Sequence, residues 1–288
     1  MGPDVSTIQR CPAPRPHGQI KTVWARENSH RQTEPMGIER YGITELPAMR
    51  AAGRVAAQTL QYVGQRLEPG MSTRDIDVLV REDTARRGGK PSQLGYHGFP
   101  GAVCTSRNHV VCHGIPSPSE HIREGDIINV DVTTYFQGFH GDTSATFVIG
   151  QASSEARRLV EVTERALWAG IEQVRPNARL GDIGAAISEL AKREGYTVVK
   201  DFGGHGIGRL MHMEPHVSHV GERGRGLRLK PGMTFTIEPM LNQGSSEIRI
   251  LEDEWTVVTA DGKLSAQFEH TIHVTEQGYE VLTLLERP

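Results

Sequence analysis

The chain has 288 residues, of which 37% are hydrophobic and 23% are charged, and its formal net charge is −3. This balance describes a soluble globular protein with ample material for a core, and it gives no electrostatic reason to expect a nucleic-acid partner. No segment approaches the roughly 20 apolar residues that cross a membrane, and the N-terminus lacks the apolar stretch of a secretory signal. Three cysteines without zinc-finger spacing fit a reducing compartment, so we expect a cytoplasmic protein.

Residues 1–40 form a Pro-rich N-terminal extension that we expect to be irregular. It contains five prolines, charges of both signs and little hydrophobic periodicity. Such a segment buries too little apolar surface to offset the entropy of ordering it. The stretch "PAPRP" (12–16) favours polyproline II, the conformation that aromatic-lined grooves recognise. The extension is therefore either a tether to a partner or a solvated arm without one.

A unit of one amphipathic helix, a turn and a second helix occurs twice in the rest of the chain. Apolar residues recur at helical spacing from Met49 to Leu67 and again from Leu159 to Val174. Each stripe stops at a proline, and the segments that follow, 69–88 and 176–195, match one another at a constant shift of about 107 residues. The chain therefore looks like two related half-domains, at about 44–150 and 153–285, rather than a solenoid.

The same shift aligns two strand-like segments and places an acid at the same point of each. "EGDIINVDV" falls on "PGMTFTIEP", so that Asp131 corresponds to Glu238. Glycine-containing turns at 138–141 and 244–246 indicate hairpins, with Asp142 opening the strand after the first turn. Helices before strands in each half predict an α+β fold, in which one curved antiparallel sheet carries the helices on its outer face.

Acidic and imidazole side chains gather in these strand-like or glycine-flanked settings: His113, Asp131, Asp142, His205, His212, Glu238 and Glu269. Carboxylates that converge on one sheet face repel each other, and two divalent ions would relieve that repulsion. Such a site makes hydroxide available for attack on a carbonyl, with a histidine stabilising the oxyanion and Glu238 carrying a proton to the leaving nitrogen. Each residue taken alone also suits a surface acid or a packed histidine, and the duplicated acids favour a site.

Other chemistries fit the sequence less well. It contains no HExxH for a single-zinc peptidase and no GxSxG for a serine hydrolase. Cys112 adjoins His113, but neighbouring residues of a strand face opposite sides, which disfavours a thiol nucleophile. His216 and His219 have no comparable setting, and we expect them to be loop residues.

Six segments together resemble the type I methionine aminopeptidases. They are "VVCHGIP", "INVDVT", "HGDTSATF", "GGHGIGRLMHMEP", "GMTFTIEPM" and "SAQFEHT", and the resemblance covers residues 41–285. It implies the pita-bread fold, whose internal pseudo-twofold agrees with the repeat. It also implies removal of the initiator methionine from nascent chains with a small second residue, by a hydroxide activated in a dinuclear metal site.

The resemblance assigns roles to residues of this chain. The implied metal ligands, with Asp142 and Glu269 bridging, are Asp131, Asp142, His205, Glu238 and Glu269. Histidines 113 and 212 would contact the substrate and stabilise the transition state. The implied methionine pocket consists of Tyr96, Phe99, Cys104, Met211 and Trp255. A monovalent cation, Na⁺ or K⁺, would lie at Asn108, Val110 and Ser265.

The chain departs from the family pattern at two pocket positions and leaves alternatives open. Met211 stands where many relatives have an aromatic residue, and Gln93 replaces a smaller side chain at the pocket edge. The divalent metal can be cobalt, manganese, iron or zinc. The extension resembles PxxP-bearing arms thought to assist docking near the ribosome. The alternative functions are a proline-specific pita-bread peptidase, which usually carries a large additional N-terminal domain, and a non-catalytic pita-bread binding protein.

Overall fold

The structure is a computed structural model that describes residues 37–285. Most of the predicted extension, including "PAPRP", lies outside the described residues, and residues 37–40 have no regular secondary structure. Within the described part of the chain, no helix is long and apolar enough to cross a membrane.

Four α-helices of the described residues form two pairs, one in each half of the predicted repeat. α2 spans Leu46–Gly64 and α3 spans Thr73–Arg86, whereas α4 spans Ser154–Ile171 and α5 spans Leu180–Arg193. The second helix of each pair begins in the same way: Asp75 accepts a hydrogen bond from the backbone N–H of Ser72, and Asp182 accepts one from that of Arg179, both at 2.8 Å. A carboxylate three residues into the helix satisfies a backbone donor that has no intrahelical partner. The two halves therefore share this local structure in addition to the sequence pattern.

Within residues 37–285 the strands pair in antiparallel fashion and form four sheets. The first consists of β1 (Lys90–Pro91), β4 (Ile127–Phe136), β2 (Cys104–Arg107) and β5 (Phe139–Val148). The largest consists of β15 (Tyr279–Val281), β14 (His270–Val274), β9 (Thr234–Ile237), β7 (Gly203–Gly206) and β8 (Met213–Ser218). A three-stranded sheet consists of β13 (Ser265–Gln267), β10 (Met240–Asn242) and β6 (Thr197–Val198). Another three-stranded sheet consists of β11 (Ile248–Ile250), β12 (Val257–Thr259) and β3 (Val110–Cys112). A short 3₁₀ turn, η1, spans Tyr96–Gly98.

The two predicted hairpins have different outcomes. β4 and β5 do form one, but its turn is Gln137-Gly138, with φ values of 50° and 88° that suit a tight two-residue hairpin. The strand therefore begins at Phe139, and Asp142 lies inside it rather than at its start. The hairpin expected at 244–246 is wrong, because β10 pairs with β13 and β6 whereas β11 pairs with β12.

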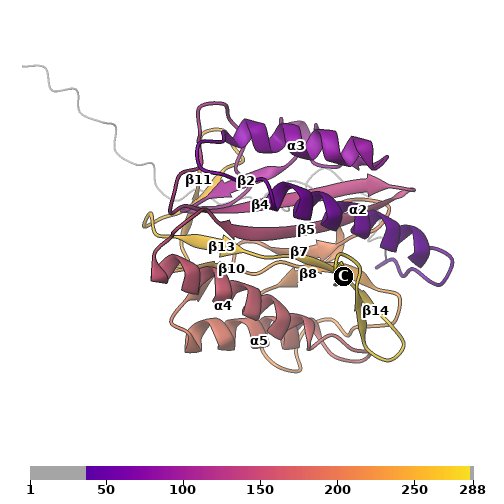
Figure 1. The fold of residues 1–288 in the computed structure, drawn as a ribbon. Helices are drawn as coiled ribbons and strands as arrows, with labels where there is room; N and C mark the ends of the chain where they lie inside the picture. Colours follow the sequence, from indigo (N-terminus) through magenta and orange to yellow (C-terminus); the bar gives the residue numbers. More distant parts are fainter. Residues whose placement is uncertain (1–36, 286–288) are drawn as a thin grey trace, which may run out of the picture. The chain divides into compact units, whose positions relative to one another are not determined.

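The helix pairs pack on the sheet layer through the predicted apolar stripes (Figure 1). Residues such as Leu159 and Ile187 are fully buried in the core below α4 and α5, and Ile76 and Val80 are fully buried beside β4. Each such side chain contributes roughly 1.5–3 kcal/mol on removal from water. α2 ends at Gly64, before the predicted Leu67, and a Cβ at Gly64 would lie 2.3 Å from the ring of Phe147.

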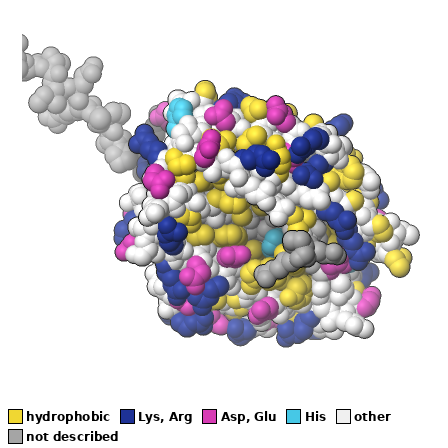
Figure 2. Space-filling model, in the orientation of Figure 1, with side chains coloured by type: hydrophobic (Ala, Val, Ile, Leu, Met, Phe, Trp, Pro, Cys, Tyr) yellow, Lys and Arg dark blue, Asp and Glu magenta, His cyan; other side chains and the backbone are white. Residues whose placement is uncertain are grey.

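The surface in Figure 2 intersperses basic and acidic side chains, with hydrophobic side chains in the hollow between the helix pairs. Charge of one sign is not gathered into a stripe on this face.

Candidate metal centre

Five predicted ligand residues come from strands of both halves. Asp131 and Asp142 lie on the paired strands β4 and β5, and His205 lies on β7. Glu238 directly follows β9, and Glu269 directly precedes β14. The halves are joined at this point, because the backbone N–H of Glu269 donates to the carbonyl of Ser144 at 3.0 Å.

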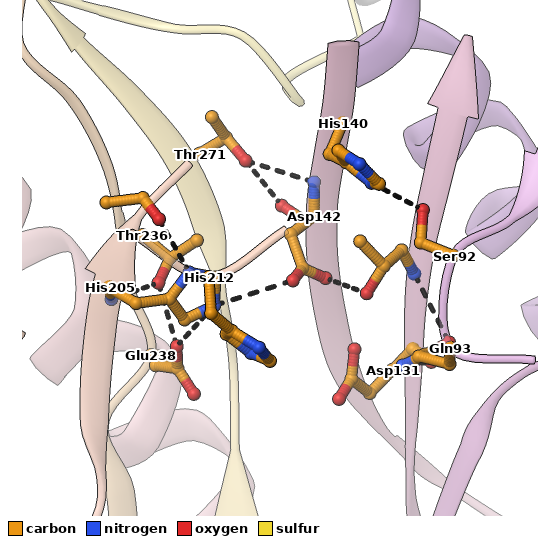
Figure 3. A network of polar contacts seen from close by, with 12 residues as sticks. Ser92, Gln93, Asp131, His140, Asp142, His205, His212, Thr236, Glu238 and Thr271 are labelled. Atoms are coloured by element: carbon orange, nitrogen blue, oxygen red, sulfur yellow. Dashed lines mark hydrogen bonds and ion pairs between the residues drawn. The ribbon is translucent and has the colours of Figure 1, made fainter. Parts of the chain in front are cut away.

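The side chains of Asp142, His205 and Glu238 point toward one another (Figure 3). The Nε2 atom of His205 lies 3.7 Å from Oδ2 of Asp142 and 3.7 Å from Oε1 of Glu238. One potential ligand atom from each of Asp142, His205 and Glu269 lies within 4.8 Å of the other two. The arrangement brings carboxylates from both halves close to the imidazole of His205.

Burial makes the ionised form of each carboxyl group costly. Asp142 and Glu269 are only 4% and 2% exposed. Burial raises the pKa of Asp142 to about 6 and that of Glu238 to about 8. It also raises the pKa of Asp131 and of Glu269 well above the usual range, and the neighbouring carboxylates add to both shifts.

The donor set fits divalent cations. None of the four carboxylates forms a salt bridge with a lysine or arginine among the described residues, and the buried Oδ1 atom of Asp131 has no hydrogen-bond partner. Burial lowers the pKa of His205 to about 4, which leaves its imidazole neutral and able to ligate a metal. Carboxylate oxygens with one imidazole suit several divalent metals.

Neighbouring hydroxyl and amide groups orient the acids. Thr133 Oγ1 donates to Oδ1 of Asp142, and Thr236 Oγ1 donates to Oε1 of Glu238, each at 2.8 Å. The Nε2 atom of Gln267 donates to the other oxygen of Glu238 at 3.2 Å. Hydrogen bonds of this kind hold metal ligands in their binding orientation.

His113 and His212 flank this cluster. The ring of His212 lies 4.2 Å from that of His205, and its Nδ1 atom is 2.8 Å from the hydroxyl of Tyr96. His113 has a φ of 56°, an unusual conformation for a residue other than glycine, and burial lowers its pKa to about 4. Burial also lowers the pKa of His212 well below its ordinary value, so both rings are neutral near pH 7.

The predicted pocket residues occupy the surroundings of these histidines. The ring of Trp255 lies 5.1 Å from that of Phe99 and 6.3 Å from that of His113. Cys104 and Met211 are both 5% exposed, and Cys104 pairs with Asp131 across β2 and β4. Phe202, which the sequence analysis did not select, also contacts His113, at a ring distance of 5.5 Å.

Two of the residues predicted to bind a monovalent cation are in contact. The carbonyl of Asn108 accepts a hydrogen bond from the backbone N–H of Ser265 at 2.9 Å, and the buried Oγ atom of Ser265 has no partner. Val110 begins strand β3 two residues after Asn108.

The expectation that His216 is a loop residue is wrong, because His216 lies in β8. His219 lies in the bend after that strand, as expected, but it is only 1% exposed. The Nε2 atom of His219 accepts the backbone N–H of Glu238 at 3.1 Å. Alternation was the available signal: Pro215, Val217 and His219 share the buried face of an extended segment.

Comparisons with known proteins agree with this geometry. The model of metallopeptidase family M24 matches residues 47–276. Methionine aminopeptidase B of Synechocystis sp. is 50% identical over 253 residues, which cover 86% of this chain and 92% of that protein. The crystal structure of methionine aminopeptidase from Rickettsia prowazekii superposes with a TM-score of 0.84 at 45% identity, covering 86% of this chain and all of that one. Prolidase from Pyrococcus furiosus has a TM-score of 0.69 at 20% identity, with 66% of its chain covered, and so shares the fold alone.

Proposed function

The chain belongs to metallopeptidase family M24, and on this premise we propose that its buried acidic cluster is the two-metal centre of a type I methionine aminopeptidase. Its architecture is the pita-bread fold. The protein is a metal-dependent aminopeptidase that removes the initiator methionine from the N-termini of nascent polypeptides.

The observation that carries the metal assignment is a group of buried acids that form no salt bridge with a lysine or arginine of residues 37–285. The residues that would hold the metal are Asp131, Asp142, His205, Glu238 and Glu269. Burial and mutual repulsion raise the pKa of the acids in the metal-free protein. Bound divalent ions supply compensating charge, Lewis acidity and a lowered pKa for water.

The protein's own side chains then orient the substrate and move protons. Because both histidines are neutral, His113 and His212 each have one N–H to donate to the carbonyl of the scissile bond. The contact with Tyr96 fixes the ring plane of His212. Glu238, which Thr236 and Gln267 hold in place, takes a proton from water and passes it to the leaving amine.

The methionine side chain occupies the pocket formed by Tyr96, Phe99, Cys104, Met211 and Trp255. Aromatic faces and sulfur atoms are favourable contacts for a thioether. Small second residues are preferred, as in the family that the sequence resembles.

Further assignments rest on the resemblance and on residue placement. A monovalent cation, Na⁺ or K⁺, binds at Asn108, Val110 and Ser265, with the unpartnered hydroxyl of Ser265 as one oxygen donor.

The enzyme acts in the cytoplasm, and the extension at 1–40 docks it near the ribosome. Removal of residues 1–36 should spare tripeptide turnover but reduce co-sedimentation with ribosomes; an unchanged sediment would contradict the docking role.

Hydrolysis of Met-Ala-Ser by metal-free protein titrated with Co²⁺ or Mn²⁺ tests the function. Release of free methionine should depend on the metal and disappear in Asp131→Asn. The control is Glu276→Gln, which alters an exposed acid in the turn before β15 and should leave turnover unchanged. Cleavage of an Ala-Pro dipeptide in place of Met-Ala-Ser would favour the proline-specific alternative.

A further inference from the structure

One edge of strand β4 is shared by two short strands that leave a gap between them. β5 pairs with β4 along its whole length, from Ile127 to Phe136, and so occupies one edge completely. β2 and β1 must therefore share the other edge, since a strand has only two. Along β4, the pairing with β2 extends as far as Asp131, and the pairing with β1 covers Thr134 and Tyr135.

The side-chain amide of Gln93 fills this gap. After β1 the backbone N–H of Ser92 still donates to the carbonyl of Thr133 at 2.9 Å, and then the chain turns away. The Nε2 atom of Gln93 donates to the carbonyl of Asp131 at 3.0 Å, and its Oε1 atom accepts the backbone N–H of Thr133 at 3.4 Å. One primary amide thus makes the two contacts that a peptide group of a paired strand would make.

The contacts of Gln93 reach two of the proposed metal ligands. Asp131 is bound through its own backbone, beside the carboxylate oxygen that has no protein partner. Thr133 is the residue whose hydroxyl holds Asp142. Figure 3 shows Gln93 next to Asp131, on the side of β4 away from Asp142. Gln93 is 7% exposed, so water does not readily replace the amide.

We propose that Gln93 is a positioning residue of the metal centre, which fixes the backbone of β4 and through it the orientation of Asp131 and Asp142. This inference rests on the proposed assignment of those acids as ligands. A smaller side chain at this position does not span the gap and leaves a buried carbonyl and a buried N–H to find other partners. The departure from the family pattern at Gln93 therefore affects the metal site in addition to the pocket edge. The contact of Nε2 with Cys104 Sγ, at 3.7 Å, links it to the proposed pocket wall as well.

Three full-length variants test the proposal with Mn²⁺ as the probe. Gln93→Met keeps the length of the side chain and removes both hydrogen bonds. Gln173→Met is the matched control, because Gln173 also donates from its amide to a backbone carbonyl, that of Ala169, at the end of α4. Asp131→Asn tests the ligand assignment separately. Each protein is titrated with Mn²⁺ by isothermal calorimetry, and its metal-free thermal unfolding is recorded.

Gln93→Met should bind Mn²⁺ about tenfold more weakly than the wild type, the usual effect of losing a group that orients a metal ligand. Its turnover of Met-Ala-Ser should fall at low Mn²⁺ and recover in part at high Mn²⁺, with Gln173→Met behaving as the wild type. Unchanged Mn²⁺ affinity in Gln93→Met, with affinity lost in Asp131→Asn, overturns the positioning role and leaves the metal assignment standing. Wild-type affinity in Asp131→Asn overturns the ligand assignment itself.

Two further results separate positioning from other roles. A raised KM with unchanged Mn²⁺ affinity would show that Gln93 only shapes the methionine pocket, and would overturn the proposal. If Gln93→Met does not fold, Gln93→Asn takes its place. That variant keeps the amide but is one methylene too short to reach both groups, and it should lose the same affinity. Wild-type affinity in Gln93→Asn would equally overturn the positioning role.

Discussion

Removal of the metal should make the stability of the protein depend on the ionisation of Glu238. Burial raises the pKa of this carboxyl group from 4.5 to about 8. An acid with a raised pKa in the folded state stabilises the fold at low pH, and this stability is lost as the pH rises through the folded-state pKa. Metal-free protein should therefore become less stable as the pH approaches and passes 8.

The size of the effect follows from the proton uptake of one group. Between about pH 6.5 and about pH 8.5 the unfolded chain binds almost no proton at Glu238, whereas the folded chain releases most of one. The free energy of unfolding should fall by about 2 kcal/mol over this window on account of Glu238 alone. For a chain of this size that corresponds to a change in melting temperature of about 3 °C.

The assay is thermal unfolding of chelator-treated wild type and Glu238→Gln, followed by circular dichroism at both pH values. The pKa values of Asp131 and Glu269 are raised in part by the charge of Glu238, so the difference between the two curves reports the ionisation of Glu238 together with its effect on these two acids. Buried histidines such as His205, whose pKa is lowered to about 4, act at lower pH. Saturating Mn²⁺ should reduce the dependence in the wild type. Parallel pH curves for the two metal-free proteins would refute the reasoning.

Substitutions at three residues give further tests. Tyr96→Phe removes the hydroxyl that holds His212, and steady-state kinetics should show a kcat lower by up to about tenfold with little change in KM; a change in KM alone would assign the hydroxyl to substrate binding. Met211→Phe should alter selectivity among N-terminal side chains with unchanged metal content by elemental analysis, and equal kinetics on all substrates would contradict a pocket role. His219→Leu leaves the N–H of Glu238 without its acceptor, so denaturant unfolding should show a free energy of unfolding lower by about 1–3 kcal/mol. His219→Gln should recover part of this loss, and equal losses in both variants would indicate a packing role instead.

The sequence predicted those features that depend on local pattern and on repetition. The helix pairs, the position of Asp131 inside a buried strand and the correspondence of Asp131 with Glu238 can all be recognised from periodicity of 3.6 or 2 residues and from a constant shift. Contacts between strands distant in sequence have no such signature. The turn at 244–246 suggested a hairpin, but the strands that flank it pair with partners elsewhere in the chain.

Side chains that support the site were harder to predict than the acids themselves. His219 follows a strand and resembles a loop residue until Glu238 is placed beside it. Gln93 resembles a change at the pocket edge until β1 and β2 are seen to share one edge of β4. In both cases the residue acts by hydrogen bonding to the backbone of a strand from another part of the chain, and no pattern of residue types along the sequence encodes such a bond.

The backbone hydrogen bonds of the two repeated acids, Asp131 and Glu238, come from different kinds of side chain. Asp131 and Glu238 occupy equivalent positions, yet an amide from the β1 side binds the carbonyl of Asp131, whereas an imidazole after β8 binds the N–H of Glu238. The duplicated backbone places one acid inside β4 and the other directly after β9. Side chains of different types, an amide and an imidazole, then bind the backbone of each acid. The two halves can therefore respond differently to substitution although their folds are alike.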